Sequence, residues 1–121
     1  MSFDLGVWHA TMRLTDASAD ELYAALCEER VDGVVPHPAV DAFYTELTAR
    51  YPELGSVPDE RIDDTDYCPW SCDLNRSPGH VLMACVWSQA KTVRTLVWNL
   101  AVKYRLAMFD PQEGRVYYPA G

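Results

Sequence analysis

The chain has 121 residues, of which 49% are hydrophobic. This length and composition exclude an intrinsically disordered chain and predict a single folded domain over residues 1–121. The start of the sequence lacks the basic flank and long apolar run of a signal peptide, and no run of eighteen apolar residues follows. We therefore expect a cytoplasmic protein that has no membrane partner.

Charge is distributed unevenly along the chain, whose formal net charge is −8. Residues 1–73 contain sixteen acidic and four basic side chains, whereas residues 74–121 contain two acidic and six basic ones. An acidic surface argues against a nucleic-acid partner and favours a basic one. The alternative is that the charge serves solubility alone, since a net charge of this size is ordinary for a soluble domain.

The first elements predicted along the chain are a strand and a helix. Phe3, Leu5 and Val7 alternate with more polar positions, which predicts a strand over residues 3–9. The segment TDASADELYAALCEE that follows has apolar residues at helical spacing. Ser18 and Glu21 have the spacing of a capping box and predict where this helix begins.

A second helix is predicted between Pro38, which suits a first helical position, and Pro52, which cannot continue a helix. Its apolar face has the spacing i, i+3, i+4, i+7 and i+11 and comprises Val40, Phe43, Tyr44, Leu47 and Tyr51. Residues 53–67 show no period and are rich in charge, which predicts a loop. The loop is long for a compact domain, which marks it as a candidate functional segment.

The second half of the chain predicts further strands and one helix. Residues 68–74 form a short predicted strand, residues 75–79 have the composition of a turn, and residues 80–87 are apolar on both faces, as in a central strand. Ser88 is the predicted cap of a third helix. Its buried stripe is expected to be Val93, Leu96, Val97, Leu100, Ala101 and Tyr104.

A hairpin is predicted at the end of the chain, where residues 106–109 and 115–118 flank a turn that contains Gly114. The element order is strand, helix, helix, strand, strand, helix, strand, strand. It predicts an α+β fold with a mostly antiparallel sheet of four to five strands and three helices packed against it.

The strongest candidate for a binding surface is the acidic loop with the aromatic residues that follow it. Clustered carboxylates accelerate encounter with a basic protein, and aromatic side chains supply contacts that hold it. The alternative is a solvated loop whose tryptophan turns into the core. The predicted partner-binding residues are Asp59, Glu60, Asp63, Asp64, Asp66, Tyr67 and Trp70.

A second candidate patch lies on the third helix. Helical spacing places Trp98 off the buried stripe and near Lys91 and Arg94. The alternative is that Trp98 covers the edge of the core.

Two cysteines four positions apart, Cys68 and Cys72, raise the question of a metal or redox site. Zinc needs four ligands, and only His80 and the histidines at positions 9 and 37 are available to complete a set. A redox pair is disfavoured because C-P-W-S-C has one residue more than C-x-x-C and lies among acids. We therefore expect packed thiols, no metal and no cofactor.

No sequence motif names a reaction, so we do not expect an enzyme. The alternative is a small enzyme or ligand-binding protein with a pocket near His9, Cys85 and Asp110, a set that sequence spacing alone neither supports nor excludes.

Several segments together resemble a set of small bacterial proteins common in actinobacteria. They are FDLGVW, the helix PHPAVDAFYTELTARYPEL, the pair Pro69-Trp70, VLMACVWSQA and LAMFDPQEGRVYYP. Some members of this set look like immunity proteins of polymorphic toxin systems. The resemblance implies a protein that binds a cognate toxin domain and occludes its active site without catalysis. It assigns no binding residue, because immunity surfaces differ from pair to pair.

Overall fold

The computed structural model describes residues 2–9 and 11–120. Within this part of the chain it confirms the predicted α+β fold, with five strands in one antiparallel sheet and three α-helices. No helix among these residues is long and apolar enough to cross a bilayer. The elements are β1 (Phe3–Trp8), α1 (Asp16–Cys27), α2 (Pro38–Arg50), the 3-10 helices η1 (Leu54–Ser56) and η2 (Asp59–Arg61), β2 (Asn75–Ser77), β3 (His80–Cys85), the 3-10 helix η3 (Trp87–Gln89), α3 (Ala90–Tyr104), β4 (Ala107–Asp110) and β5 (Arg115–Tyr117).

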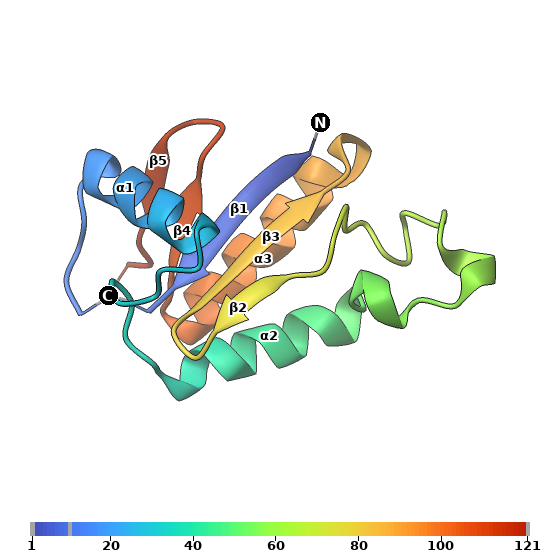
Figure 1. Ribbon diagram of the computed structural model, residues 1–121, viewed down its shortest axis with the longest axis horizontal. Coiled ribbons are helices and arrows are strands. Elements are labelled where there is room, and N and C mark those ends of the chain that lie inside the picture. The colour runs from blue at the N-terminus through green and yellow to red at the C-terminus, as the bar shows by residue number, and fades with distance from the viewer. Residues whose placement is uncertain (1, 10, 121) are drawn as a thin grey trace.

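The sheet has the strand order β2-β3-β1-β4-β5, with the first strand of the chain at its centre. Helices cover both faces, so the molecule has three layers (Figure 1). Leu5 and Val7 point toward α2 and α3, whereas Trp8 points toward α1. Because successive side chains of a strand alternate between faces, β1 supplies both halves of the core.

The second helix forms as the sequence predicts, with Val40, Phe43 and Leu47 buried. The predicted starts of the other two helices are wrong. Helix α1 is capped by Thr15, whose hydroxyl accepts a hydrogen bond of 3.1 Å from the backbone N–H of Ser18. The capping oxygen thus lies three residues before the predicted one, and Ser18 is inside the helix.

Helix α3 begins at Ala90, because residues 87–89 form the separate 3-10 helix η3. Ser88 is therefore not its cap, and the residue in the cap position, Gln89, makes no capping hydrogen bond through its side chain. The predicted stripe is largely correct. Val93, Val97, Leu100 and Ala101 are buried, and Leu96 and Tyr104 pack against them.

The predicted strand over 68–74 is wrong, and the predicted turn over 75–79 is correct only at its end. Strand β2 forms at Asn75–Ser77, since Ser77 pairs with His80 and only Pro78 and Gly79 are needed for the turn. A side chain at position 79 would lie 2.9 Å from the backbone oxygen of Val35, so this turn needs glycine for its close approach to the loop before α2. The terminal hairpin forms as predicted, with Gly114 at a φ of 67°.

Candidate partner-binding surface

The segment between α2 and β2 runs past the end of the sheet before it returns (Figure 1). Its base is buried, with Val57, Cys68 and Trp70 in the core that α2 and α3 share with the sheet. Its tip, residues 59–66, carries five acidic side chains and one arginine. We call these eight residues the acidic tip. The acidic tip thus stands at one end of the molecule on a base that is part of the core (Figure 1).

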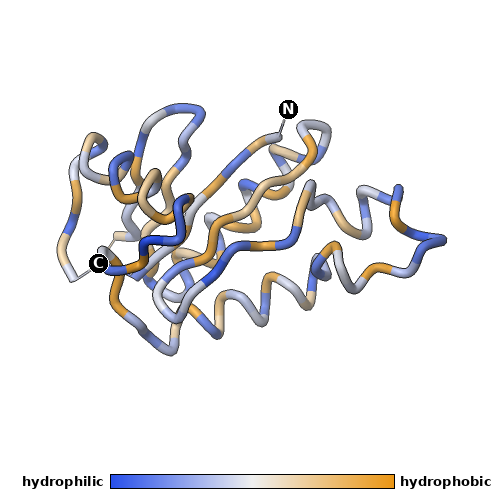
Figure 2. Tube along the Cα trace, viewed as in Figure 1, coloured by the Kyte–Doolittle hydropathy of each residue, from blue (hydrophilic) through white to orange (hydrophobic). Residues whose placement is uncertain are grey.

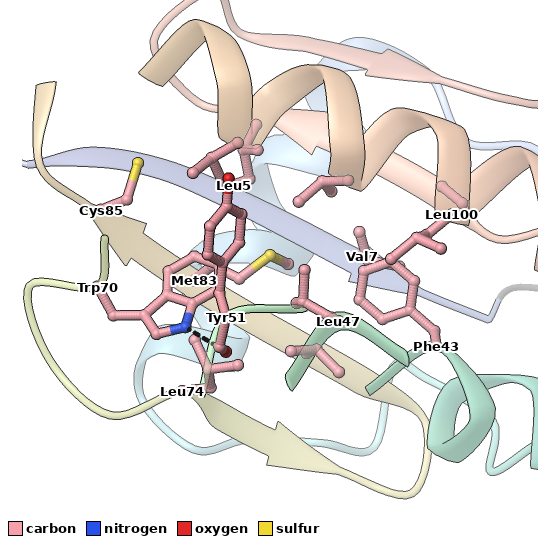
Figure 3. Close-up of a cluster of buried hydrophobic side chains, with 14 of the residues drawn as sticks. Leu5, Val7, Phe43, Leu47, Tyr51, Trp70, Leu74, Met83, Cys85 and Leu100 are labelled. Carbon is pink, nitrogen blue, oxygen red and sulfur yellow. Dashed lines mark hydrogen bonds between the residues drawn. The ribbon is translucent and has the colours of Figure 1, made fainter. Parts of the chain in front are cut away.

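Trp70 belongs to the base and not to the surface. Its side chain is 3% exposed and points into the cluster formed by Leu5, Met83 and their neighbours (Figure 3). The indole N–H donates a hydrogen bond of 3.1 Å to the backbone oxygen of Tyr51. Trp70 therefore cannot supply the predicted aromatic contact to a partner, and its burial agrees with the alternative stated above.

The carboxylate of Glu53 connects the two ends of the loop. Glu53 accepts hydrogen bonds from the hydroxyl of Tyr44, at 2.6 Å, and from the backbone N–H of Leu74, at 2.8 Å. Burial raises the pKa of Tyr44, and the hydrogen bond to Glu53 raises it further, because both favour the neutral phenol. Glu53 thus fixes the loop and is not one of the acids offered to solvent.

Asp64 shapes the acidic tip from within. Its carboxylate pairs with Arg61 at 3.0 Å and accepts hydrogen bonds from the backbone N–H groups of Asp66 and Tyr67. The hydrogen bond from Arg61 lowers the pKa of Asp64, and the backbone N–H of Tyr67 lowers it further. Tyr67 is half-buried beneath the guanidinium of Arg61, which lies 3.7 Å from the ring centre. Asp64 and Tyr67 therefore act first as parts of the turn.

Three other acids of the tip remain open to a partner. Asp59, Glu60 and Asp63 are exposed, and none of them takes part in an ion pair within the described part of the chain. Asp66 is also exposed and accepts a hydrogen bond of 2.8 Å from the side chain of Gln89. The tip is hydrophilic apart from one exposed apolar residue, Ile62 (Figure 2).

Trp87 is the aromatic residue that sequence analysis missed. It lies on η3, is 50% exposed, and rests edge-on against Phe3 with 5.3 Å between ring centres. Because Gln89 of the same 3-10 helix bonds to Asp66, the indole lies on the element that touches the acidic tip. The sequence placed Trp87 in a strand, where alternation would bury it on the same face as Cys85. The strand ends at Cys85, so alternation no longer applies.

The second predicted patch is only partly available at the surface. Arg94 donates hydrogen bonds of 3.1 Å to the buried carboxylate of Asp110 and to Glu113. Trp98 is partly buried and packs edge-on against Tyr117, with ring centres 6.0 Å apart. Lys91 is exposed. Arg94 and Trp98 thus attach the terminal hairpin to α3, in keeping with a tryptophan that covers the edge of the core.

The structure does not bring His9, Cys85 and Asp110 together. Cys85 pairs with Phe3 at one end of β1, and His9 follows the other end, six residues along the strand and about 20 Å away at the usual rise of a strand. Asp110 is 2% exposed, and its oxygens accept hydrogen bonds from Arg94 and Gln112. Four cavities among the described residues are lined by other side chains.

The two cysteines of the loop lie in different surroundings. Cys68 is buried, and its thiol donates a hydrogen bond of 3.3 Å to the backbone oxygen of Pro52, whereas Cys72 is exposed. Burial raises the pKa of the Cys68 thiol, and partial burial of the sulfur raises that of Cys72 although the residue as a whole is exposed, so both thiols stay protonated at neutral pH. Residues 2–9 and 11–120 contain no group of three or more His, Cys, Asp or Glu side chains that could hold a metal ion.

The site as a whole is an acidic tip on a buried loop base, with a half-exposed tryptophan on a neighbouring element. Such an arrangement can attract and hold a basic surface. Comparison with protein-family models, with curated proteins and with solved structures found no match for this chain.

Proposed function

We propose that this chain is a non-enzymatic binding protein that recognises a basic protein partner through its acidic tip. The observation that carries the proposal is the pairing of a buried loop base with exposed carboxylates at Asp59, Glu60 and Asp63. A loop that served only solubility would not need a tryptophan, a thiol and a glutamate to fix its ends. A fixed loop loses little conformational entropy on binding, which favours affinity.

Trp87 is the proposed hydrophobic contact of this surface. Half of its side chain is exposed, and tryptophan is among the residues that most often dominate binding energy at protein interfaces. Its contact with Phe3 holds the ring in place before a partner arrives. The acids then determine the rate of encounter, and the indole contributes to the lifetime of the complex.

The most specific form of the proposal is an immunity protein of a bacterial toxin system, in accordance with the resemblance stated above. The partner would be a toxin domain with a basic face, such as a nuclease, and the acidic tip would occupy that face in place of the phosphates of the substrate. Inhibition would require no chemistry from this chain.

The test is binding to the product of the adjacent gene, where a toxin domain would be encoded. The informative variant reverses the three free acids, Asp59→Lys, Glu60→Lys and Asp63→Lys. The control makes the same change of net charge at exposed acids elsewhere, Asp20→Lys, Glu21→Lys and Asp32→Lys. Loss of binding in the tip variant alone supports the acidic tip as the interface. Equal binding by both variants would contradict it.

A further inference from the structure

A small cleft lies beside the base of the loop, on the face of the sheet that α1 covers only in part. It encloses about 160 Å³ between the end of α1, the strands β1 to β3 and the residues that follow the loop. Its apolar lining includes Leu82 and Ala84 of β3. Sites for drug-sized ligands usually measure about 300–1,000 Å³, so this cleft has room only for the end of a side chain or for a very small molecule.

Two carboxylates border the cleft without a basic counterpart. Asp4 accepts a hydrogen bond from the hydroxyl of Ser2, and Asp73 accepts one from the backbone N–H of Gly55, both at 2.8 Å and both at Oδ1. Neither forms an ion pair within residues 2–9 and 11–120, and no lysine or arginine lines the cleft. Two negative charges beside apolar surface therefore lack a cation.

The neighbouring titratable groups show the same negative potential. Partial burial of its sulfur raises the pKa of the Cys72 thiol, and the carboxylates of Asp4 and Asp73 raise it further. Burial likewise raises the pKa of Tyr23, to which Cys27 and Asp4 add. Both shifts have the direction that a region unfavourable to anions produces. The Cys72 thiol is thus a protonated neighbour of the carboxylates rather than a nucleophile.

We propose that the cleft receives the side chain of one arginine or lysine from the partner protein. Such side chains combine an apolar stem with a cationic head, which matches an apolar lining bordered by carboxylates. The hydrogen bond from Gly55 to Asp73 joins the cleft to the base of the loop that carries the acidic tip. The source of the cation rests on the proposed function, whereas the affinity of the cleft for a cation does not.

The experiment is a titration of the ¹⁵N-labelled chain followed by NMR, with N-acetyl-arginine amide and N-acetyl-lysine amide as probes. N-acetyl-citrulline amide, which has nearly the shape of the arginine probe but no charge, is the matched control ligand. We expect saturable shifts of the backbone amides of Asn75, Leu82 and Ala84 with one or both cations, at the millimolar affinity of a small ligand, and none with citrulline. Absence of saturable shifts with both cations, or equal shifts with citrulline, would overturn the inference.

Two variants separate charge from shape. Asp4→Asn combined with Asp73→Asn removes the charges, and Ala84→Leu fills the lining of the cleft while it keeps them. The double Asn variant should weaken binding of the cationic probe up to about fivefold, the scale of one exposed ion pair. Ala84→Leu should weaken it as well, because the stem of the probe loses its place in the cleft. Asp20→Asn, at an exposed position of α1, should leave the affinity unchanged. If Ala84→Leu does not fold, the double Asn variant decides alone, and unchanged affinity in it overturns the inference.

The same variants distinguish this inference from the proposed function. Reversal of Asp59, Glu60 and Asp63 should abolish partner binding and leave the probe titration unchanged. A partner that binds the double Asn variant as tightly as the wild-type chain would overturn the cleft as a receptor for its side chain and leave the acidic tip in place. If partner binding is unchanged in the double Asn variant and n-butylammonium binds the wild-type chain tightly, the cleft is assigned to a free amine instead.

Discussion

The indole N–H of Trp70 donates a hydrogen bond of 3.1 Å to the backbone oxygen of Tyr51, nineteen residues earlier in the chain. The two rings also meet edge to face, with centres 6.1 Å apart. The contact links the end of α2 to the return of the acidic loop. It lies in the core and holds the base of the loop against the end of α2 (Figure 3).

Trp70→Ala should lower the free energy of unfolding by about 3–5 kcal/mol, because it removes a large buried side chain and leaves the Tyr51 oxygen without its donor. Urea denaturation followed by circular dichroism measures this change. Trp87→Ala is the matched control, since that indole is half exposed, and it should lower the stability by about 1 kcal/mol at most. Similar losses in the two variants would contradict the assignment of Trp70 to the core and Trp87 to the surface.

Asp110→Ala should destabilise the chain by about 2–3 kcal/mol, the scale of hydrogen bonds to a buried charged group. The Asp110 side chain is 3% exposed and pairs with Arg94, so its removal leaves a partly buried guanidinium without that partner. It also removes the acceptor for the backbone N–H groups of Gln112 and Glu113 in the β4–β5 turn. Thermal unfolding of this variant beside Asp20→Ala, at an exposed position, provides the comparison. A loss below about 1 kcal/mol would show that the pair is not structural.

His80 should make the fold sensitive to mild acid. It is 1% exposed, and burial lowers its pKa below the value of about 6.5 in an unfolded chain. Above pH 6.5 both states hold it neutral, and its contribution to stability is complete. As the pH falls below 6.5, the unfolded chain binds the proton before the folded chain does. The free energy of unfolding therefore decreases until the pH reaches the lower pKa of the folded state.

Urea denaturation between pH 7.5 and 5 measures this loss, whose steepest slope for one proton is about 1.4 kcal/mol per pH unit. His80→Asn should unfold more easily at every pH but show a shallower slope. The two other histidines remain in both proteins and serve as the internal control. Equal slopes would exclude His80 as the source of the acid sensitivity.

Gly114 has a φ of 67°, which side chains other than glycine adopt only with strain, although the space around it is open. Gly114→Ala should therefore destabilise the chain by about 1 kcal/mol through backbone strain alone. Gly114→Asn should destabilise it less, because asparagine tolerates this conformation better. Melting temperatures of the two variants decide the point. Equal decreases in melting temperature would indicate that the presence of a side chain at this position, rather than its φ, destabilises the turn.

Much of the fold could be predicted because its signals are local. The α2 stripe from Val40 to Leu47 and the terminal hairpin with Gly114 depend on spacing and on one turn residue, and both formed as expected. The start of α1 was misplaced because Thr15 and Ser18 are both good caps, and only the hydrogen bond to the Ser18 N–H shows which one acts.

The site was harder to predict because its residues are sorted by contacts distant in sequence. Asp64 and Asp63 are adjacent acids, yet one pairs within the turn and the other is free. Trp70 was expected at the surface but is buried, because its indole N–H donates to a backbone oxygen near the end of α2. Trp87 was expected within a strand but is half exposed, because β3 ends before it. No spacing in the sequence contains this information.

The central claim is that the free acids of the tip steer a basic partner onto this chain. The most direct measurement is the association rate constant with the product of the adjacent gene, determined by stopped-flow fluorescence over a range of ionic strength. The account predicts a fast rate that falls steeply with salt, and a much slower one after reversal of Asp59, Glu60 and Asp63 but not of Asp20, Glu21 and Asp32. No binding, or a rate unaffected by both salt and the tip reversal, would contradict it.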